Sequence, residues 1–135
     1  MEINLLKKYP KTKRNLNKRR ADKSNKSINI ARRFGKEFFD GDRKYGYGGL
    51  NYDKKYWSNV AKDIIKFYNL NNKSSILDIG CAKGFMLFDF RKHLKKIKIR
   101  GIDISKYAIN NSKKEVKKYL SVGNAKKLRF KNNTF

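Results

Sequence analysis

Apolar residues recur at helical spacing in the stretch that begins near Asp53. Two rows of them share one face: Tyr56, Val60, Ile64 and Phe67, widened by Trp57, Ala61, Ile65 and Tyr68. An apolar stripe of this width predicts an amphipathic helix that packs on a core. The Asn-rich segment NLNNKSS, residues 69–75, is expected to end the helix.

The segments that follow alternate between strand and helix patterns. Short apolar runs predict strands in SILDIG (75–80), KIKIRGID (96–103) and KKYLSVGNA (117–125). Helices are expected between the strands, in GFMLFDFRKHL (84–94) and SKYAINNSKK (105–114). Ser105 is the expected N-cap of the second of these helices. The order of elements predicts an α/β fold with a parallel sheet and right-handed crossovers.

The N-terminal part of the chain has a weaker pattern. Residues 7–26 are basic and polar and hold the only proline, so we expect a disordered or loosely helical basic arm. Residues 28–39 fit one short helix, and the tyrosine- and glycine-rich residues 45–52 fit a loop. Three regions are therefore predicted: the arm at 1–27, the helix and loop at 28–52, and the α/β domain at 53–135.

The most informative feature of the composition is its excess of positive charge. Lys and Arg outnumber Asp and Glu 36 to 11 in 135 residues, which gives a formal net charge of +25. This balance predicts attraction to nucleic acid or anionic membrane surfaces, with strong salt dependence. The single cysteine excludes an intrachain disulfide and a cysteine metal cluster. No apolar run approaches the roughly 20 residues that span a bilayer, and no apolar leader is present, so we expect a cytoplasmic protein.

Candidate chemistry lies in the loop after the first predicted strand. Asp78 stands just before the turn, Gly80 and Gly84 bracket three residues, and a helix begins at once. Small residues let a ligand approach the backbone, and the start of a helix offers unpaired N–H groups. Asp103 follows the second strand, about 20 to 25 residues on, where a carboxylate can accept both hydroxyls of a ribose. The pattern predicts a nucleoside cofactor.

Two classes of cofactor fit a strand–helix–strand unit with this acid. A dinucleotide site carries G-x-G-x-x-G, and this chain has Ala82 and Phe85 where that pattern needs glycine. Asp78 would also repel a pyrophosphate in a poorly solvated crevice. S-adenosylmethionine, which carries a sulfonium and an ammonium group, suits this loop better.

Three motifs resemble those of class I S-adenosylmethionine-dependent methyltransferases: ILDIGCAKGF (76–85), IRGIDIS (99–105) and SVGNAKKLRFKNNTF (121–135). The resemblance implies a Rossmann-like fold with S-adenosylmethionine as the cofactor. It places one set of residues at the methionine end of the cofactor: Asp78, Gly80, Cys81 and Gly84, with Ala82 beside them. It places Asp103 at the ribose, and a further set around the adenine: Ile104, Asn124 and Ala125.

The chain also departs from the pattern of that family. Ala82 replaces the middle glycine of the first motif, Asn124 stands where many members carry Asp, and Arg129 replaces a usual proline. The family sheet has seven strands in the order 3-2-1-4-5-7-6, and this chain supplies strands 1–3. We therefore expect the N-terminal part of a longer methyltransferase, truncated after the third motif and inactive alone. Its first strand is expected to be an exposed apolar edge.

The remaining chemistry-bearing residues have simpler interpretations. Cys81 fits a small loop filler better than a nucleophile, and His93 fits a surface position near a helix C-terminus. Lys83 is expected to face solvent. The tyrosines of the 45–52 loop are expected to pack over the preceding helix; the alternative is a lid that contacts cofactor or acceptor through Tyr45, Tyr47 and Tyr52.

The function expected from these features is methyl transfer from S-adenosylmethionine to a small-molecule or carbohydrate-like acceptor. No residue can be assigned as the catalytic base, and no metal site is expected. One alternative is an RNA methyltransferase that uses residues 7–26 to bind its substrate. The other is a non-catalytic, basic nucleic-acid-binding module.

Overall fold

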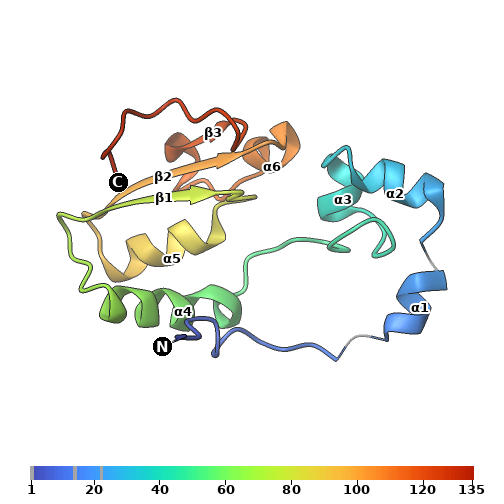
Figure 1. The fold of residues 1–135 in the computed structure, drawn as a ribbon, viewed down its shortest axis with the longest axis horizontal. Coiled ribbons are helices and arrows are strands. Elements are labelled where there is room, and N and C mark those ends of the chain that lie inside the picture. The colour runs from blue at the N-terminus through green and yellow to red at the C-terminus, as the bar shows by residue number, and fades with distance from the viewer. Residues whose placement is uncertain (1, 14, 22) are drawn as a thin grey trace.

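The computed structural model describes residues 2–13, 15–21 and 23–135. Its elements follow in the order α1 (Leu16–Ala21), α2 (Asn25–Ala31), α3 (Lys36–Asp40), α4 (Lys54–Phe67), β1 (Ser75–Ile79), α5 (Phe85–His93), β2 (Lys98–Asp103), α6 (Lys106–Asn110), a 3-10 turn (Lys117–Tyr119) and β3 (Leu120–Val122) (Figure 1). Within the described ranges, no helix has the length and apolar character needed to cross a membrane.

The three strands form one parallel sheet in the order β1-β2-β3. Ser75 of β1 aligns with Lys98 of β2, and Gly101 of β2 aligns with Leu120 of β3. The carboxyl ends of the strands therefore meet at one edge, and the arrowheads of β1 and β2 point towards α6 and α3 in Figure 1. Open α/β sheets bind their ligands at this edge. The predicted α/β class is confirmed, and β1 is an outer strand of the described sheet.

The predicted helix after Asp53 is α4, and the Asp53 side chain caps it by accepting a hydrogen bond from the Lys55 N–H at 3.0 Å. Helix α4 packs against α5, which in turn packs against β2. The main core cluster lies between α5, the sheet and the 105–120 segment, and consists of Cys81, Leu87, Ile97, Ile99, Ile109, Val116 and Leu120. This core holds the loop after β1 against the ends of β2 and β3.

The single helix expected over residues 28–39 is wrong. The chain forms α2 and α3 with a break between them, where Phe34 has a φ of 48° and Gly35 is extended. The break turns α3, so that the Phe38 ring lies 5.1 Å from the Phe34 ring and 5.0 Å from the Phe39 ring. Packing among these aromatic rings outweighs the propensity to continue the helix.

Some predicted elements are shorter or less buried than their patterns indicate. Helix α6 spans five residues, where a helix over 105–114 was expected, although Ser105 caps it as predicted by accepting from the Ala108 N–H at 3.0 Å. Strand β3 has three residues. Four of the five residues of β1 are half-buried and Ile79 is exposed, because β1 is an outer strand.

The N-terminal arm lies along the molecule over much of its length. The Tyr9 ring lies 4.9 Å from the Trp57 ring and 5.4 Å from the Tyr56 ring, both on α4. Lys8 Nζ forms an ion pair with Asp63 Oδ1 at 2.7 Å. The arm then crosses towards α1, which has no buried residue (Figure 1). These contacts hold residues 8–9 of the arm against α4.

Candidate cofactor-binding site

The loop after β1 turns sharply and is tied to the end of β2. Gly80 and Gly84 have φ values of 84° and 76°, and Ala82 has a φ of 48°. The N–H groups of Gly80 and Cys81 both donate to the Ile102 carbonyl, at 2.8 and 3.0 Å. Three residues in the left-handed region within five positions explain why small residues occupy this loop.

The two glycines of the loop have different roles. A Cβ on Gly84 would lie 2.7 Å from Leu120 Cδ1 and 3.0 Å from Val116 Cγ2, so this position requires glycine for packing against the core. A Cβ on Gly80 would meet no atom within 4 Å, so this position faces open space. Open space beside a backbone in the left-handed region is what a closely approaching ligand needs.

This difference predicts unequal costs for two matched substitutions. Gly84→Ala is expected to lower the free energy of unfolding by about 3 kcal/mol, because it combines backbone strain with overpacking. Gly80→Ala is expected to cost about 1 kcal/mol from strain alone. Urea unfolding followed by circular dichroism measures both. Equal costs would contradict the packing role of Gly84.

Asp103 lies at the end of β2 and is 8 % exposed. Its carboxylate accepts from the Ala82 N–H through Oδ2 and from the Ser105 N–H through Oδ1, both at 2.8 Å. These bonds fix the carboxylate beside the loop, and each oxygen retains a lone pair for a further donor. The side chain is therefore oriented before any ligand binds.

Asp78 is the fourth residue of β1 and pairs with Gly101 across the sheet. Burial, and to a lesser extent the nearby Asp103 carboxylate, raise the pKa of Asp78 to about 6. Among the described residues, no hydrogen bond or ion pair reaches its carboxylate. A desolvated carboxylate without a partner favours a cationic or hydrogen-bond-donating ligand.

A pocket of about 450 Å³ opens at the carboxyl edge of the sheet. Six of the predicted cofactor-binding residues line it: Gly80, Ala82, Asp103, Ile104, Asn124 and Ala125. The structure thus brings together residues from all three sequence motifs. Three other predicted residues do not line this pocket: Asp78, Cys81 and Gly84. The side chains of Ile79 and Ile104 are 49 % and 58 % exposed. They line the pocket with an apolar surface that suits a planar ring.

Cys81 belongs to the core and not to the pocket. It is 6 % exposed and packs in the main cluster. Burial, followed by the negative charges of Asp78 and Asp103, raises the pKa of its thiol to about 12. A thiol that stays protonated at neutral pH is a poor nucleophile, in line with its interpretation as a loop filler.

The other side of the pocket is formed by aromatic residues of the N-terminal region: Phe34, Phe38, Phe39 and Tyr47. Tyr47 stacks on Phe39 with ring centroids 5.8 Å apart, and the Tyr47 N–H donates to the Phe38 carbonyl at 2.9 Å. Ser105 Oγ donates to the Phe34 carbonyl at 2.5 Å and so joins this region to α6. We name α2, α3 and the loop to residue 50 the cap.

The three tyrosines predicted as lid candidates occupy different places. Tyr47 lines the pocket, whereas Tyr45 lies beside Lys44, whose Nζ is 5.0 Å from the Tyr45 ring centroid. Tyr52 packs on α5 and its hydroxyl donates to Asp89 Oδ1 at 2.7 Å. Asp89 is fully buried, and burial raises its pKa despite this hydrogen bond. Tyr52 therefore supports α5 in this structure.

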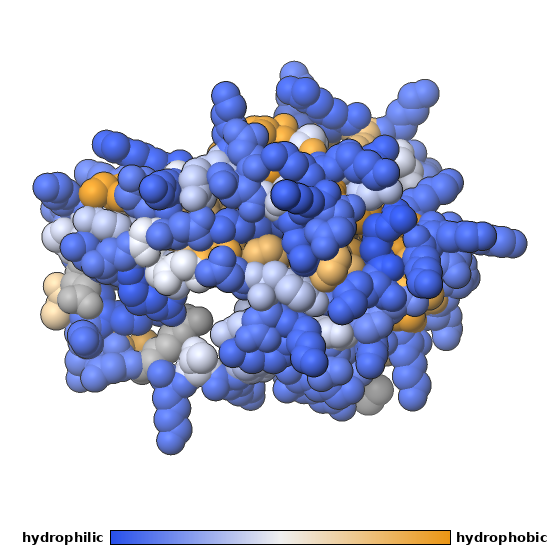
Figure 2. All heavy atoms as spheres, turned by 180° about the vertical axis from the view of Figure 1, so that it is seen from behind, coloured by the Kyte–Doolittle hydropathy of each residue, from blue (hydrophilic) through white to orange (hydrophobic). Residues whose placement is uncertain are grey.

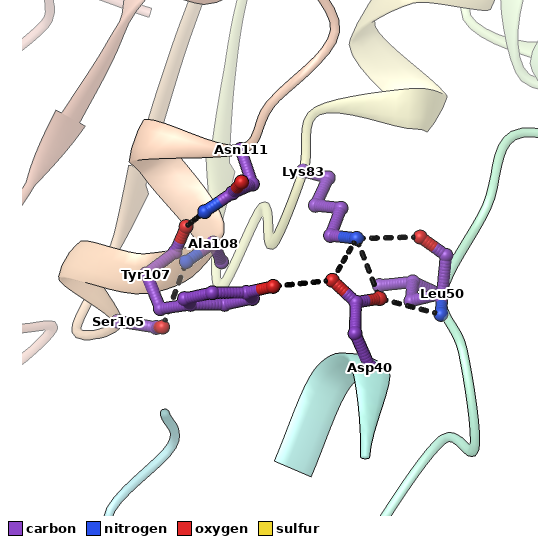
Figure 3. Close-up of polar contacts among 7 residues, drawn as sticks. All are labelled: Asp40, Leu50, Lys83, Ser105, Tyr107, Ala108 and Asn111. Carbon is purple, nitrogen blue, oxygen red and sulfur yellow. Dashed lines mark hydrogen bonds and ion pairs between the residues drawn. The ribbon is translucent and has the colours of Figure 1, made fainter. Parts of the chain in front are cut away.

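The expectation that Lys83 faces solvent is wrong. Its side chain is 7 % exposed, and Nζ lies 2.7 Å from both carboxylate oxygens of Asp40 and 2.8 Å from the Leu50 carbonyl (Figure 3). Tyr107 donates its hydroxyl to Asp40 Oδ2 at 2.7 Å, and the Leu50 N–H donates to Asp40 Oδ1 at 3.1 Å. We name this set the Asp40 cluster; it joins the cap to the loop after β1 and to α6.

The Asp40 cluster explains why a lysine can be buried in the loop after β1. All three donors of the Lys83 ammonium find acceptors, which offsets much of its desolvation. Burial opposes the ionisation of Asp40, but hydrogen bonds from Lys83, Tyr107 and Leu50 outweigh it and hold the pKa of Asp40 below its ordinary value. The cap is therefore held over the pocket by a charged contact.

Sequence reasoning missed Asp40, Tyr107 and the cap phenylalanines. Asp40 lies 43 positions from Lys83, and only the fold brings the two together. One sequence signal was available: Phe34, Phe38 and Phe39 form a dense aromatic group in an otherwise polar region. His93 Nε2 lies 3.0 Å from the Ser58 carbonyl of α4, which gives it a helix-packing contact.

Comparison with known proteins agrees with the fold. Residues 70–135 match the model of a family described as a methyltransferase domain. A solved structure described as the MccD protein is similar, with 33 % identity and a TM-score of 0.50. The alignment covers 56 % of this chain and 36 % of that one, so the chain spans about a third of the length of that protein. A search of curated proteins finds no match.

The parallel sheet, the glycine loop and the family match together support a class I methyltransferase fold. Residues 70–135 match the methyltransferase domain family and contain three parallel strands of a Rossmann-like sheet.

Proposed function

We propose that the protein takes part in methyl transfer from S-adenosylmethionine, which the 450 Å³ pocket binds. The observation that carries this proposal is that residues of all three sequence motifs line this pocket, among them the oriented Asp103 carboxylate. The Asp78 carboxylate, in the strand that leads to the loop, is desolvated and has no hydrogen bond or ion pair among the described residues. The sulfonium and ammonium groups of this cofactor supply the positive charge that such a carboxylate favours. The open space beside Gly80 supports the same ligand.

Different residues of the pocket would bind different parts of the cofactor. Asp103, already oriented by two backbone N–H groups, would accept hydrogen bonds from the ribose hydroxyls. Ile104 and Ala125 would contact the faces of the adenine. Asn124 accepts from the Lys126 N–H at 2.9 Å through Oδ1, and the same oxygen retains a lone pair for the adenine amino group.

The cofactor supplies an activated methyl group because its sulfur is a good leaving group. The protein residues then have to hold the cofactor and the acceptor in line and exclude water, which are positioning roles. The aromatic side chains of the cap cover the pocket and suit the exclusion of water. No residue of this chain is proposed as a base.

We propose a small-molecule or carbohydrate-like acceptor for this methyl group. A second hollow of about 540 Å³ lies beside the cofactor pocket, and Phe38 and Tyr47 line both. Its volume lies within the range of small-molecule sites. Methylation of RNA is the second candidate, and it is favoured by cationic residues next to this hollow, including Arg19 and Arg43.

Calorimetric titration with S-adenosylhomocysteine tests the cofactor assignment. Asp103→Ala is expected to weaken binding about 100-fold, because two charge-assisted hydrogen bonds to the ribose are lost. Since this variant also leaves the Ala82 and Ser105 N–H groups without acceptors, its folding must be checked by circular dichroism.

Asn124→Ala provides a second, milder test, because the hydrogen bond that it removes within the protein is exposed. We expect it to weaken binding about 5-fold. Equal affinity in wild type and Asp103→Ala, or the absence of any binding by the wild type, would contradict the proposed cofactor site.

A further inference from the structure

The arm and the cap enclose two adjoining hollows whose lining residues differ in chemistry. The first, of about 540 Å³, is rich in aromatic residues: Tyr9, Phe38, Tyr47, Tyr56, Trp57 and Phe85. The second, of about 660 Å³, is lined by cationic residues of the arm and cap: Lys13, Lys18, Arg19, Lys23, Arg43 and Lys44. We name them the aromatic hollow and the basic groove.

The two hollows adjoin each other, because five residues line both: Thr12, Arg19, Phe38, Arg43 and Gly46. Figure 2 shows an opening in the surface of the molecule, bordered by hydrophilic residues and by residues of intermediate hydropathy. A ligand that occupies the groove can therefore extend a group into the aromatic hollow.

The charged residues that line the groove are mostly positive. Among the described residues that line the groove, Asp42 is the only acidic one. It forms an exposed ion pair with Lys44, in which the two charged atoms lie 3.8 Å apart. In the aromatic hollow, the Asp53 carboxylate is paired with Lys55 Nζ at 2.9 Å. The groove therefore retains most of its positive charge, which attracts a polyanion.

The border between the two hollows is held in place from the arm and from the cap. The contacts of Tyr9 with Tyr56 and Trp57, and of Lys8 with Asp63, hold the arm against α4. Arg43 Nη1 donates to the carbonyls of Gly46 and Tyr47, both at 2.8 Å, which fixes the guanidinium at the border of the two hollows. Cations held in place beside aromatic rings can bind an anion and a planar group together.

We propose that the basic groove and the aromatic hollow bind single-stranded nucleic acid. The phosphates lie along the cations of the groove, and one base enters the aromatic hollow and stacks there, in the space that a small-molecule acceptor would otherwise occupy. A duplex is disfavoured, because its bases are stacked on each other and cannot enter a recessed hollow. An acidic peptide would satisfy the cations but would leave the aromatic hollow without a planar partner.

Fluorescence anisotropy with a labelled 12-nucleotide oligouridine, over a series of NaCl concentrations, measures this binding without any methyl-transfer cofactor. The double variant Lys18→Ala/Lys23→Ala should bind about 10-fold more weakly. It should also reduce the magnitude of the salt slope by roughly 1.4, because two phosphate contacts are lost. The control Lys95→Ala/Lys98→Ala removes the same charge from exposed lysines outside both hollows and should change neither quantity.

The fluorescence of Trp57, the single tryptophan, reports on the aromatic hollow. Oligouridine is expected to quench it, whereas inorganic tripolyphosphate is expected to bind weakly and leave it unchanged. Equal binding of a matched RNA duplex, equal quenching by tripolyphosphate, or an equal loss in the two double variants would each overturn the proposal. Since no cofactor is present, these outcomes are independent of the fate of the proposed methyl transfer.

Discussion

Replacing Asp40 with alanine is expected to lower the free energy of unfolding by about 3–4 kcal/mol, which is a large part of the stability of a small domain. The variant leaves the Lys83 ammonium buried, with the Leu50 carbonyl as its remaining acceptor in the Asp40 cluster. A buried charge without its partner costs far more than the intact ion pair contributes. Urea unfolding followed by circular dichroism measures the difference.

Asp42→Ala is the matched control, because it removes the same carboxylate two positions along the chain. Asp42 is exposed; it lies 3.8 Å from Lys44 Nζ and accepts from the Lys44 N–H at 2.9 Å through Oδ1, so its loss should cost about 1 kcal/mol. The double variant Asp40→Ala/Lys83→Met should be more stable than Asp40→Ala alone, because the uncompensated charge is also removed. A double variant less stable than Asp40→Ala would contradict this account.

The Asp40 cluster also has a defined dependence on pH. Because the pKa of Asp40 is held below its ordinary value in the folded protein, its contribution is fully present above the unfolded pKa of about 4. The contribution of ionised Asp40 to the free energy of unfolding is lost as the pH falls through the pKa that Asp40 has in the folded protein. At neutral pH the Asp40 carboxylate is therefore ionised, and its contact with Lys83 is fully present.

Asp78→Asn is expected to have opposite effects on stability and on cofactor binding. At pH 7 the substitution removes a desolvated negative charge near Asp103, so the free energy of unfolding should rise by about 1–2 kcal/mol after allowance for partial exposure. Affinity for S-adenosylmethionine should fall about 10-fold or more, because the cation loses its carboxylate partner.

The sign of the pH effect distinguishes Asp78 from Asp40. The pKa of Asp78 is raised to about 6 in the folded protein, so its protonated form is favoured there. The stabilisation of the folded protein by protonated Asp78 is fully present below the unfolded pKa of about 4. It is lost as the pH rises through the folded pKa of about 6. Wild-type stability relative to Asp78→Asn should therefore decrease between pH 4 and pH 6.

Thermal unfolding of both proteins across this pH range, with titrations of S-adenosylmethionine at pH 5 and pH 7, tests the prediction. Wild-type affinity should increase from pH 5 to pH 7 as Asp78 ionises, and the Asp78→Asn variant should lose most of this increase. A constant stability difference across the range would show that Asp78 does not titrate as proposed.

Periodicity was sufficient to place the α/β region. The apolar stripe after Asp53, the strand patterns and the predicted helix N-cap at Ser105 each correspond to an observed element. These features depend on neighbours within a few positions, where side-chain period and capping chemistry act directly. Residues of the glycine loop, Asp103 and the Asn124 segment meet at one pocket because parallel strands place their carboxyl ends together.

Tertiary structure alone decided the remaining features. The break at Phe34 arises because aromatic packing among α2, α3 and the loop outweighs local helix propensity. Lys83 is buried because Asp40 approaches it from the cap. The aromatic hollow exists because Tyr9 packs on α4. Each of these depends on contacts between residues far apart in the chain, which local sequence pattern does not encode.

The sequence by itself thus determined the class of fold and the small, acidic composition of the loop after β1, since both follow from short-range patterns of apolar, acidic and small residues. The tertiary structure decided which residues cover that loop and where the positive charge gathers. Charge counts predict attraction to a polyanion, but a groove requires cations from the arm and the cap to meet across the same space.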